Sequence, residues 1–314
     1  MESNIKTVFV TGAAGLIGAA VTQALLSRGT KVVACDDFSI GSWQAEKENL
    51  VWAKTDVSAP GMTTLLEKYG PDAVIHCAAH PGGLSLSDPV EDVKVNALGS
   101  IRIFDWCARA GKTLIYLSSS VIYGDQPPGF PIRESAEVMP GTIYAACKIA
   151  CENFLRILAD GYGLQWTVLR LFSTYGAGHK PGTSQGIVNI MLTQLLAGNR
   201  LIVRGSLDRV RDLLYVDDAA RAIVESVFAR EARGQVLNVG TGTGIIISQL
   251  IESLCRGLGR QMSAIEIVEE PGTVGDPLWN VADCSMAQEI LGFSAQNDIE
   301  TGISKLIRNR IPEI

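Results

Sequence analysis

Short apolar stretches alternate with longer helical patterns through the first half of this 314-residue chain. The strand-like stretches lie at residues 7–11, 32–35, 50–53, 73–77, 113–118 and 166–171. The helical patterns between them cover residues 16–28, 61–69, 89–110 and 143–160. Strands that are apolar throughout need cover on both faces, and helices between parallel strands provide that cover. The alternation therefore predicts an α/β fold with a doubly wound parallel sheet.

The pattern changes near residue 175, where glycine and turn residues become frequent. Helical patterns at 187–198, 216–230, 248–258 and 284–291 then alternate with strand-like segments at 201–203 and 236–239. We expect residues 1–175 to form the main domain and residues 176–314 to form mainly a smaller C-terminal lobe. Segments near 213–240 are expected to rejoin the first domain.

Gly12, Gly15 and Gly18 join the first strand to the first helix in a GxxGxxG pattern. Such a turn lets the backbone approach a pyrophosphate, and the helix start offers free N–H groups. An ordinary glycine-rich turn is the alternative. The second strand ends in Asp36, near the spacing of about 20 residues at which an acid meets the adenosine ribose. Because no Arg or Lys follows before Lys47, the pattern favours NAD over NADP and an NAD-binding Rossmann domain.

Tyr144 and Lys148 form the single Tyr-x-x-x-Lys pattern of the chain. Four residues apart on a helix, their side chains share one face. An ammonium group beside a phenol favours the phenolate, which is a general base for a sugar hydroxyl. Simple packing on an exposed helix is the alternative. Ser118 and the two serines after it end a strand at the edge where ligands of α/β proteins bind.

Several further segments follow in a recognisable order. They are Asp36, Asp56-Val57, HCAAH at 76–80, Asn96, SSSVIYG at 118–124, YAACK at 144–148, RLFSTYG at 170–176, RDLLYVDD at 211–218 and GDP at 275–277. With the glycine pattern, they resemble the extended short-chain dehydrogenase/reductase family, in its branch of NAD-dependent nucleotide-sugar epimerases and dehydratases. The resemblance implies that Ser119 is the catalytic hydroxyl, Tyr144 the acid/base and Lys148 the residue that holds the nicotinamide ribose.

The resemblance and the glycine pattern together give a set of expected contacts. The expected NAD contacts are Gly12, Ala14, Gly15, Leu16, Ile17, Asp36, Asp37, Asp56, Val57, Ala78, Ala79, Asn96, Ser118, Tyr144, Lys148 and Phe172. The expected substrate contacts are His80, Ser119, Ser120, Tyr144, Ser173, Arg211 and Asp276. Arg211 suits a diphosphate because guanidinium is a forked donor. A surface pair of Arg211 with Asp212 or Asp217 is the alternative.

The residues after the catalytic hydroxyl narrow the expected chemistry. Ser120 and Val121 stand where dehydratases and decarboxylating relatives usually carry acids. What remains is oxidation and re-reduction at a sugar C4, which predicts a 4-epimerase acting on a UDP-sugar. The alternatives are a reductase or dehydratase of a nucleotide-linked keto-sugar and, as a different class, a non-catalytic NAD-binding protein. Intact Ser119, Tyr144 and Lys148 argue against the last.

Two positions depart from the family pattern. Thr273 stands where relatives often have an Arg before Gly275 and Asp276, so one expected phosphate-binding cation is missing. Ser173 replaces the Asn that is usual in the RLFS segment.

Composition restricts the class of partner. With 27 basic and 33 acidic residues the net charge is -6, which argues against nucleic acid and anionic membranes as partners.

No signal peptide and no membrane-spanning run are visible, so a cytoplasmic protein is expected. The histidines, His76, His80 and His179, lack metal-ligand spacing, and no metal is expected. Apolar residues on more than one face of helices 89–110 and 143–160, which pair across a twofold axis in the family, predict a homodimer.

Overall fold

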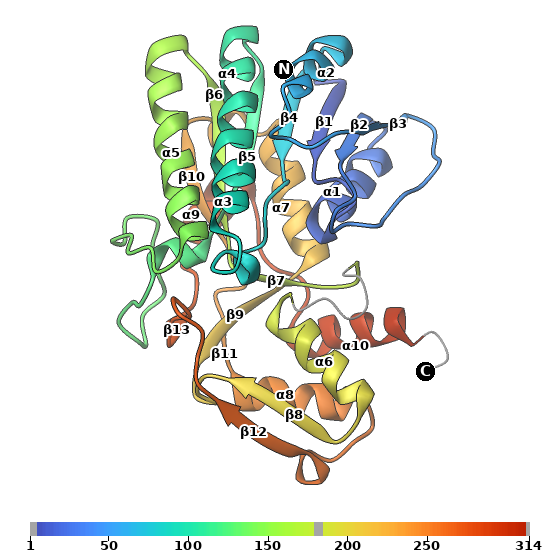
Figure 1. The fold of residues 1–314 in the computed structure, drawn as a ribbon, viewed down its shortest axis with the longest axis vertical. Coiled ribbons are helices and arrows are strands. Elements are labelled where there is room, and N and C mark those ends of the chain that lie inside the picture. The colour runs from blue at the N-terminus through green and yellow to red at the C-terminus, as the bar shows by residue number, and fades with distance from the viewer. Residues whose placement is uncertain (1–4, 179–184, 312–314) are drawn as a thin grey trace.

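A parallel sheet forms the centre of the larger part of the molecule (Figure 1). The structure is a computed structural model, and it describes residues 5–178 and 185–311. Its seven strands lie in the order β10-β6-β5-β4-β1-β2-β3. The strands are β1 (Thr7–Thr11), β2 (Lys31–Asp36), β3 (Leu50–Lys54), β4 (Ala73–His76), β5 (Thr113–Ser119), β6 (Gln165–Leu171) and β10 (Gln235–Val239). The strand order reverses between β1 and β4, the place where such sheets bind ligands. The predicted doubly wound α/β class is confirmed.

Helices cover both faces of this sheet, because neighbouring residues of each strand point to opposite sides. Val8 and Val10 of β1 pack against α1 and α7, whereas Phe9 packs on the opposite side with α2, α4 and α5. The first layer holds α1 (Leu16–Ser27), α7 (Val216–Phe228) and α9 (Ser285–Leu291), and the second holds α2 (Gly61–Tyr69), α4 (Ser100–Ala110) and α5 (Ile143–Tyr162). Both layers are visible in Figure 1.

The continuous helix expected over 89–110 is divided. A short α3 (Pro89–Asp92) leads into a π-helical segment (Val93–Gly99), and α4 follows. The carbonyl of Asn96, inside the wide turns, accepts hydrogen bonds from Ser100 Oγ at 2.6 Å and from Cys151 Sγ at 3.1 Å. Side-chain donors therefore satisfy a carbonyl of the π-helical segment.

The smaller lobe is built around β9 (Val210–Tyr215), which pairs with β7, β11 and β13. The other strands are β7 (Ser173–Tyr175), β8 (Arg200–Arg204), β11 (Gly244–Ile246), β12 (Glu266–Glu270) and β13 (Trp279–Asn280), and the helices are α6 (Ile187–Ala197), α8 (Ile247–Gly257) and α10 (Ile299–Arg310). Short 3₁₀ turns lie at Gly82–Leu84, Ser120–Tyr123, Arg230–Ala232 and Met262–Ala264. A separate apolar core that includes Leu192, Leu213 and Leu306 fills the lobe.

The chain passes between the two parts more than once. After β9 in the lobe, α7 packs on α1, and β10 pairs with β6 at the edge of the central sheet. Among the described residues, no helix combines the length and the apolarity needed to cross a membrane.

Candidate active site

The loop between β1 and α1 depends on glycine at two positions. Gly12 has a φ of +64°, and a Cβ there would lie 2.6 Å from the Ala78 amide nitrogen. A Cβ on Gly18 would lie 2.1 Å from the Gly12 carbonyl oxygen. No side chain fits at either place. The first helical hydrogen bond runs from Ala19 to Gly15, so amides at the helix start can bind an anion, and the loop fits a dinucleotide pyrophosphate.

Asp36 binds the same loop from the end of β2. Its Oδ2 accepts a hydrogen bond of 2.9 Å from the Ala14 N–H, and its Oδ1 accepts one of 2.8 Å from the Phe38 N–H. Burial raises the pKa of the Asp36 carboxyl, and the two amide hydrogen bonds offset part of that rise. The carboxylate thus lies beside the glycine loop, where an acid can meet a ribose.

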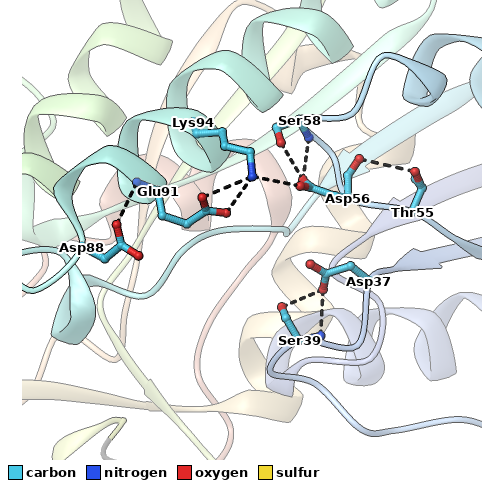
Figure 2. Close-up of polar contacts among 8 residues, drawn as sticks. All are labelled: Asp37, Ser39, Thr55, Asp56, Ser58, Asp88, Glu91 and Lys94. Carbon is cyan, nitrogen blue, oxygen red and sulfur yellow. Dashed lines mark hydrogen bonds and ion pairs between the residues drawn. The ribbon is translucent and has the colours of Figure 1, made fainter.

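Lys94 bridges two acids at the opposite rim of this region (Figure 2). Its Nζ lies 3.0 Å from Glu91 Oε1 and 3.4 Å from Asp56 Oδ2. Asp56 Oδ1 also accepts hydrogen bonds of 2.8 Å from the N–H and the hydroxyl of Ser58. Burial would raise the pKa of Asp56, but the Ser58 hydrogen bonds and Lys94 lower it below the ordinary value. Asp56 therefore stays ionised as a hydrogen-bond acceptor.

A cavity of about 630 Å³ joins these elements, within the range of about 300–1,000 Å³ usual for small-molecule sites. Of the expected site residues, its lining includes Gly12, Gly15, Leu16, Ile17, Asp36, Asp37, Asp56, Val57, Ala78, Ala79, His80 and Tyr144. The expected residues outside its lining are Ala14, Asn96, Ser118, Ser119, Ser120, Lys148, Phe172, Ser173, Arg211 and Asp276. The glycine loop, the two acids at the end of β2 and Tyr144 thus face one space.

Tyr144 and Lys148 lie one turn apart at the start of α5. Thr142 caps this helix with its side chain, and Ser85 Oγ accepts a hydrogen bond of 2.9 Å from the Tyr144 N–H. Lys148 is only 3% exposed. Its Nζ donates a hydrogen bond of 2.8 Å to the Leu117 carbonyl and lies 5.4 Å from the centre of the Tyr144 ring. The ammonium group is therefore fixed beside the phenol.

The serines that end β5 have different environments. Ser118 Oγ donates a hydrogen bond of 2.7 Å to Glu152, so its hydroxyl serves the interior. Ser120 is buried, and its carbonyl accepts a hydrogen bond of 3.4 Å from Asn280 Nδ2. Ser119 is half-buried, and its Oγ accepts a long backbone hydrogen bond of 3.4 Å. Within the described residues, this is the only hydrogen bond that involves the Ser119 hydroxyl.

Two of the expected cofactor residues make contacts inside the protein. Asn96 Oδ1 accepts a hydrogen bond of 2.9 Å from the His80 N–H, and Asn96 Nδ2 donates one of 3.0 Å to the His80 carbonyl. Asn96 therefore positions a segment that lines the cavity. Phe172 is 1% exposed and packs against Tyr123. Ser173 follows it and is half-buried at the start of β7.

Arg211 pairs with Asp276, not with Asp212 or Asp217. Asp212 instead accepts hydrogen bonds from the backbone of residues 241, 242 and 282. A second arginine, Arg209, which the motif analysis overlooked, binds the other oxygen of Asp276.

The histidines differ in their surroundings. His80 lines the cavity, and its buried Nε2 has no hydrogen-bond partner within residues 5–178 and 185–311. His76 is bonded on both sides, to Thr11 Oγ1 at 2.7 Å and to Ser100 Oγ at 2.9 Å. His179 lies outside the described residues. In the part of the chain that the structure describes, no group of three His, Cys, Asp or Glu residues could hold a metal ion.

Two further glycines shape the site and were missed in the sequence analysis. A Cβ on Gly41 would lie 2.4 Å from the Ala14 carbonyl carbon, and one on Gly82 would lie 3.3 Å from the Tyr144 ring. Gly82 belongs to the segment HPGGLSLS, and the two adjacent glycines of that segment are a sequence pattern that could have indicated a close approach of the backbone. No comparable sequence pattern surrounds Gly41, which stands alone between Ile40 and Ser42.

Comparisons with known proteins agree with this arrangement. The chain is 31% identical to the UDP-glucose 4-epimerase of Mycolicibacterium smegmatis over 306 residues, covering 95% of this chain and 96% of that protein. It is 29% identical to the UDP-glucuronate 4-epimerase of Thermodesulfobacterium geofontis, with 95% and 94% covered. The crystal structure of the UDP-glucose 4-epimerase of Thermus thermophilus in complex with NAD is 28% identical, with a TM-score of 0.89 and 98% and 100% covered.

The family model described as the NAD dependent epimerase/dehydratase family matches residues 8–240, which include the glycine loop, Asp36 and the Tyr144–Lys148 pair. The cofactor is NAD, in agreement with the fit of the loop to a dinucleotide. The chain therefore belongs to the NAD dependent epimerase/dehydratase family.

Proposed function

We propose that this protein is an NAD-dependent UDP-sugar 4-epimerase. The observation that carries the proposal is that Tyr144, beside the buried ammonium group of Lys148, lines the same cavity as the glycine loop. A base for a hydroxyl proton thus faces the space where a nicotinamide cofactor fits. The names of the two relatives described above support the reaction at C4.

In this mechanism, Tyr144 takes the proton of the C4 hydroxyl and later returns it, as general base and then general acid. Ser119 donates a hydrogen bond to the same oxygen. Lys148, held by the Leu117 carbonyl, stabilises the phenolate and holds the nicotinamide ribose. NAD, when bound, supplies reversible hydride transfer at C4. The 4-keto sugar rotates so that its opposite face receives the hydride. Because the hydride and the proton both return to the sugar, no external oxidant is consumed.

The residues after Ser119 support epimerisation over elimination. Removal of water from the sugar needs an additional acid and base near the reacting carbons. Ser120 is buried with its carbonyl bonded to Asn280, and Val121 is half-buried and apolar. Neither residue provides a carboxyl group. We therefore assign the simpler chemistry, which requires only a hydride and one proton.

In the proposed complex, residues 1–175 hold NAD and residues 176–314 contribute mainly to substrate binding, while α7 and β10 return to the central sheet. Arg211, fixed by Asp276, contacts the diphosphate. The sugar would be lined by His80, Ser119, Ser120, Tyr144 and Ser173. His80 suits this role because its buried Nε2 has no partner among the described residues.

The test uses the protein as purified. Heat denaturation should release NAD, which mass spectrometry identifies. Without added cofactor, the protein should then interconvert the C4 epimers of UDP-glucose or UDP-glucuronate, followed by chromatography. The matched control is Tyr144→Phe, which should retain NAD but convert each sugar more slowly by at least about a hundredfold.

Two outcomes would contradict the proposal. If every UDP-sugar remains unchanged while a nucleotide-linked keto-sugar consumes NADH stoichiometrically, the protein is a reductase. If the protein binds NAD and turns over neither class of substrate, a non-catalytic role replaces the proposed one.

We also propose a homodimer formed through the helical layer of α4 and α5. Apolar side chains are exposed on α5, with Ile157 at 67%, and on the π-helical segment that leads into α4, with Val93 at 48%. Two copies could bury these faces together about a twofold axis. Light scattering at micromolar concentration should give twice the chain mass of 33.6 kDa. A monomer mass would contradict this assembly.

A further inference from the structure

Two arginines bind a single carboxylate, that of Asp276. Arg211 lies in β9, and Arg209 lies in the turn before it. Arg209 Nη1 binds Asp276 Oδ2, and Arg211 Nη2 binds Asp276 Oδ1. The arginine side chains are 5% and 6% exposed, and that of Asp276 is 25% exposed. Two cations on one anion leave an excess positive charge that is largely removed from water.

The other hydrogen-bond partners of the two guanidinium groups in the described part of the chain are neutral carbonyls. Arg209 Nε donates a hydrogen bond of 3.0 Å to the Ser206 carbonyl, and Arg211 Nη1 donates one of 2.8 Å to the Val210 carbonyl. Each group has five N–H donors, so, counting partners among the described residues, both guanidinium groups keep further N–H donors without a partner.

Burial disfavours the charged arginines where they stand. It lowers the pKa of Arg209, and burial together with the charge of Arg209 lowers the pKa of Arg211 to about 10. Asp125 opposes this effect on Arg211 from a distance, with its Oδ1 bonded to the Leu278 N–H. An excess charge held out of water is costly unless a second anion approaches it.

The cluster adjoins the proposed active site. Gly275, directly before Asp276, packs so closely on Gly141 that a Cβ on Gly275 would lie 3.0 Å from the Gly141 carbonyl oxygen and 2.7 Å from Thr142. Thr142 caps the helix that carries Tyr144. On the other side, Arg211 lies in register with Asn280 of β13, which bonds the Ser120 carbonyl. Figure 1 shows β9 and β13 at the junction of the two parts.

The turn from Thr273 to Asp276 contains no Lys or Arg. Thr273 is exposed, and its carbonyl accepts a hydrogen bond from the Asp276 N–H. Across from this turn, Gly205 leaves room for Arg209, because a Cβ on Gly205 would lie 3.0 Å from the guanidinium carbon. The cation therefore comes from residue 209, on the neighbouring segment, while residue 273 is neutral.

We propose that Arg209 acts with Arg211 as a second cation for the substrate diphosphate, with Asp276 holding both guanidinium groups in position. Arg209 is then a specificity-determining residue that takes the place of a cation absent at Thr273. The identity of the diphosphate as that of a nucleotide-sugar rests on the proposed function. The excess charge at this cluster does not.

The test is calorimetric titration of the NAD-saturated protein, so that the glycine loop is not open to the added anion. The probes are UDP, inorganic pyrophosphate and uridine. The variants are Arg209→Gln and Arg209→Lys, and the matched control is Arg256→Gln, whose side chain is 59% exposed. Loss of one charged hydrogen-bonding group predicts UDP and pyrophosphate binding weaker by about tenfold to a hundredfold in Arg209→Gln. Uridine binding and NAD content should not change.

Arg209→Lys keeps the positive charge but loses the paired N–H donors of the guanidinium group. UDP should therefore bind to this variant several-fold more weakly than to the unmodified protein. If Arg209→Gln does not fold, this second variant decides the question. Unchanged UDP affinity in a folded Arg209 variant would overturn the inference while leaving the proposed function intact. Arg209-dependent binding of pyrophosphate without any binding of UDP would instead retain the anion site and reject the uridine substrate.

Discussion

Glu152 binds Arg170 through two hydrogen bonds, from Arg170 Nε at 3.1 Å and from Nη2 at 2.7 Å, in a place where both side chains are at most 5% exposed. Burial alone would lower the pKa of Arg170, but Glu152 raises it above the ordinary value. Glu152 follows Lys148 by one helical turn, and it also accepts the hydrogen bond from Ser118. The pair therefore fixes α5, which carries Tyr144 and Lys148, against the ends of β5 and β6.

Breaking this pair should be costly. Glu152→Gln leaves a buried guanidinium without its carboxylate, and we expect the free energy of unfolding to fall by about 3–5 kcal/mol. Urea denaturation followed by circular dichroism measures the change. The matched control is Glu252→Gln, in an exposed pair with Arg256, where a change of at most about 1 kcal/mol is expected. Equal effects in the two variants would show that the buried pair contributes no more than a surface one.

Tyr144→Phe should separate catalysis from cofactor binding. The variant keeps the ring beside Lys148 and removes the hydroxyl that exchanges the proton, so kcat should fall by about 10²–10⁴-fold. NAD content should remain that of the unmodified protein. Tyr162→Phe, at an exposed position of the same helix, should change neither quantity. A Tyr144→Phe variant with full turnover would remove Tyr144 from the catalytic role.

His76 should make stability depend on pH. Burial, followed by the charge of Lys148, lowers the pKa of His76 from 6.5 to about 3. Between these values the unfolded chain binds a proton that the folded chain does not. This contribution to stability is complete above pH 6.5 and is lost as the pH falls toward 3, by about 1.4 kcal/mol per pH unit.

The difference between the unmodified protein and His76→Gln isolates this effect from the titration of carboxylates. Unfolding free energies from about pH 7 to about pH 4.5, within the window that the two pKa values define, should show the smaller slope in the variant. The imidazole resonances of His76 should also report a neutral ring at about pH 5. Equal slopes, or a charged ring at that pH, would contradict the assignment.

The sequence was sufficient for the central sheet because each of its strands is an apolar stretch bounded by turns. Val8, Phe9 and Val10 have no exposed surface in the structure, so their pattern reports burial on both faces directly. The glycine loop and the Tyr144–Lys148 pair could be predicted for a related reason. Each is a local motif whose geometry is set by residues close in the chain.

The lobe could not be predicted as well, because its order comes from distant pairings. β13 has two residues and β7 has three, too few to show a period of alternation. Arg209 and Asp276 are separated by 67 positions, and no local pattern connects them. The bridge from Lys94 to Asp56 has the same origin. Such contacts depend on how distant segments of the fold pack together.

Cofactor choice gives the last prediction. Asp36 lies at the glycine loop with both carboxylate oxygens bonded to backbone amides, and Asp37 lines the same cavity. Among the described residues, no salt bridge brings a cation to Asp36. A 2′-phosphate there would place like charges together, which costs several kcal/mol, so NAD should bind more tightly than NADP by about a hundredfold or more.

Asp36→Ala should narrow this ratio of affinities by weakening NAD binding more than NADP binding. Because loss of the loop anchor affects both cofactors alike, the ratio of dissociation constants, measured by titration after removal of bound NAD, reports the ribose contact itself. Asp37→Ala is the matched control and should change the ratio less. Equal affinity of the unmodified protein for the two cofactors would show that Asp36 is not the ribose-binding acid.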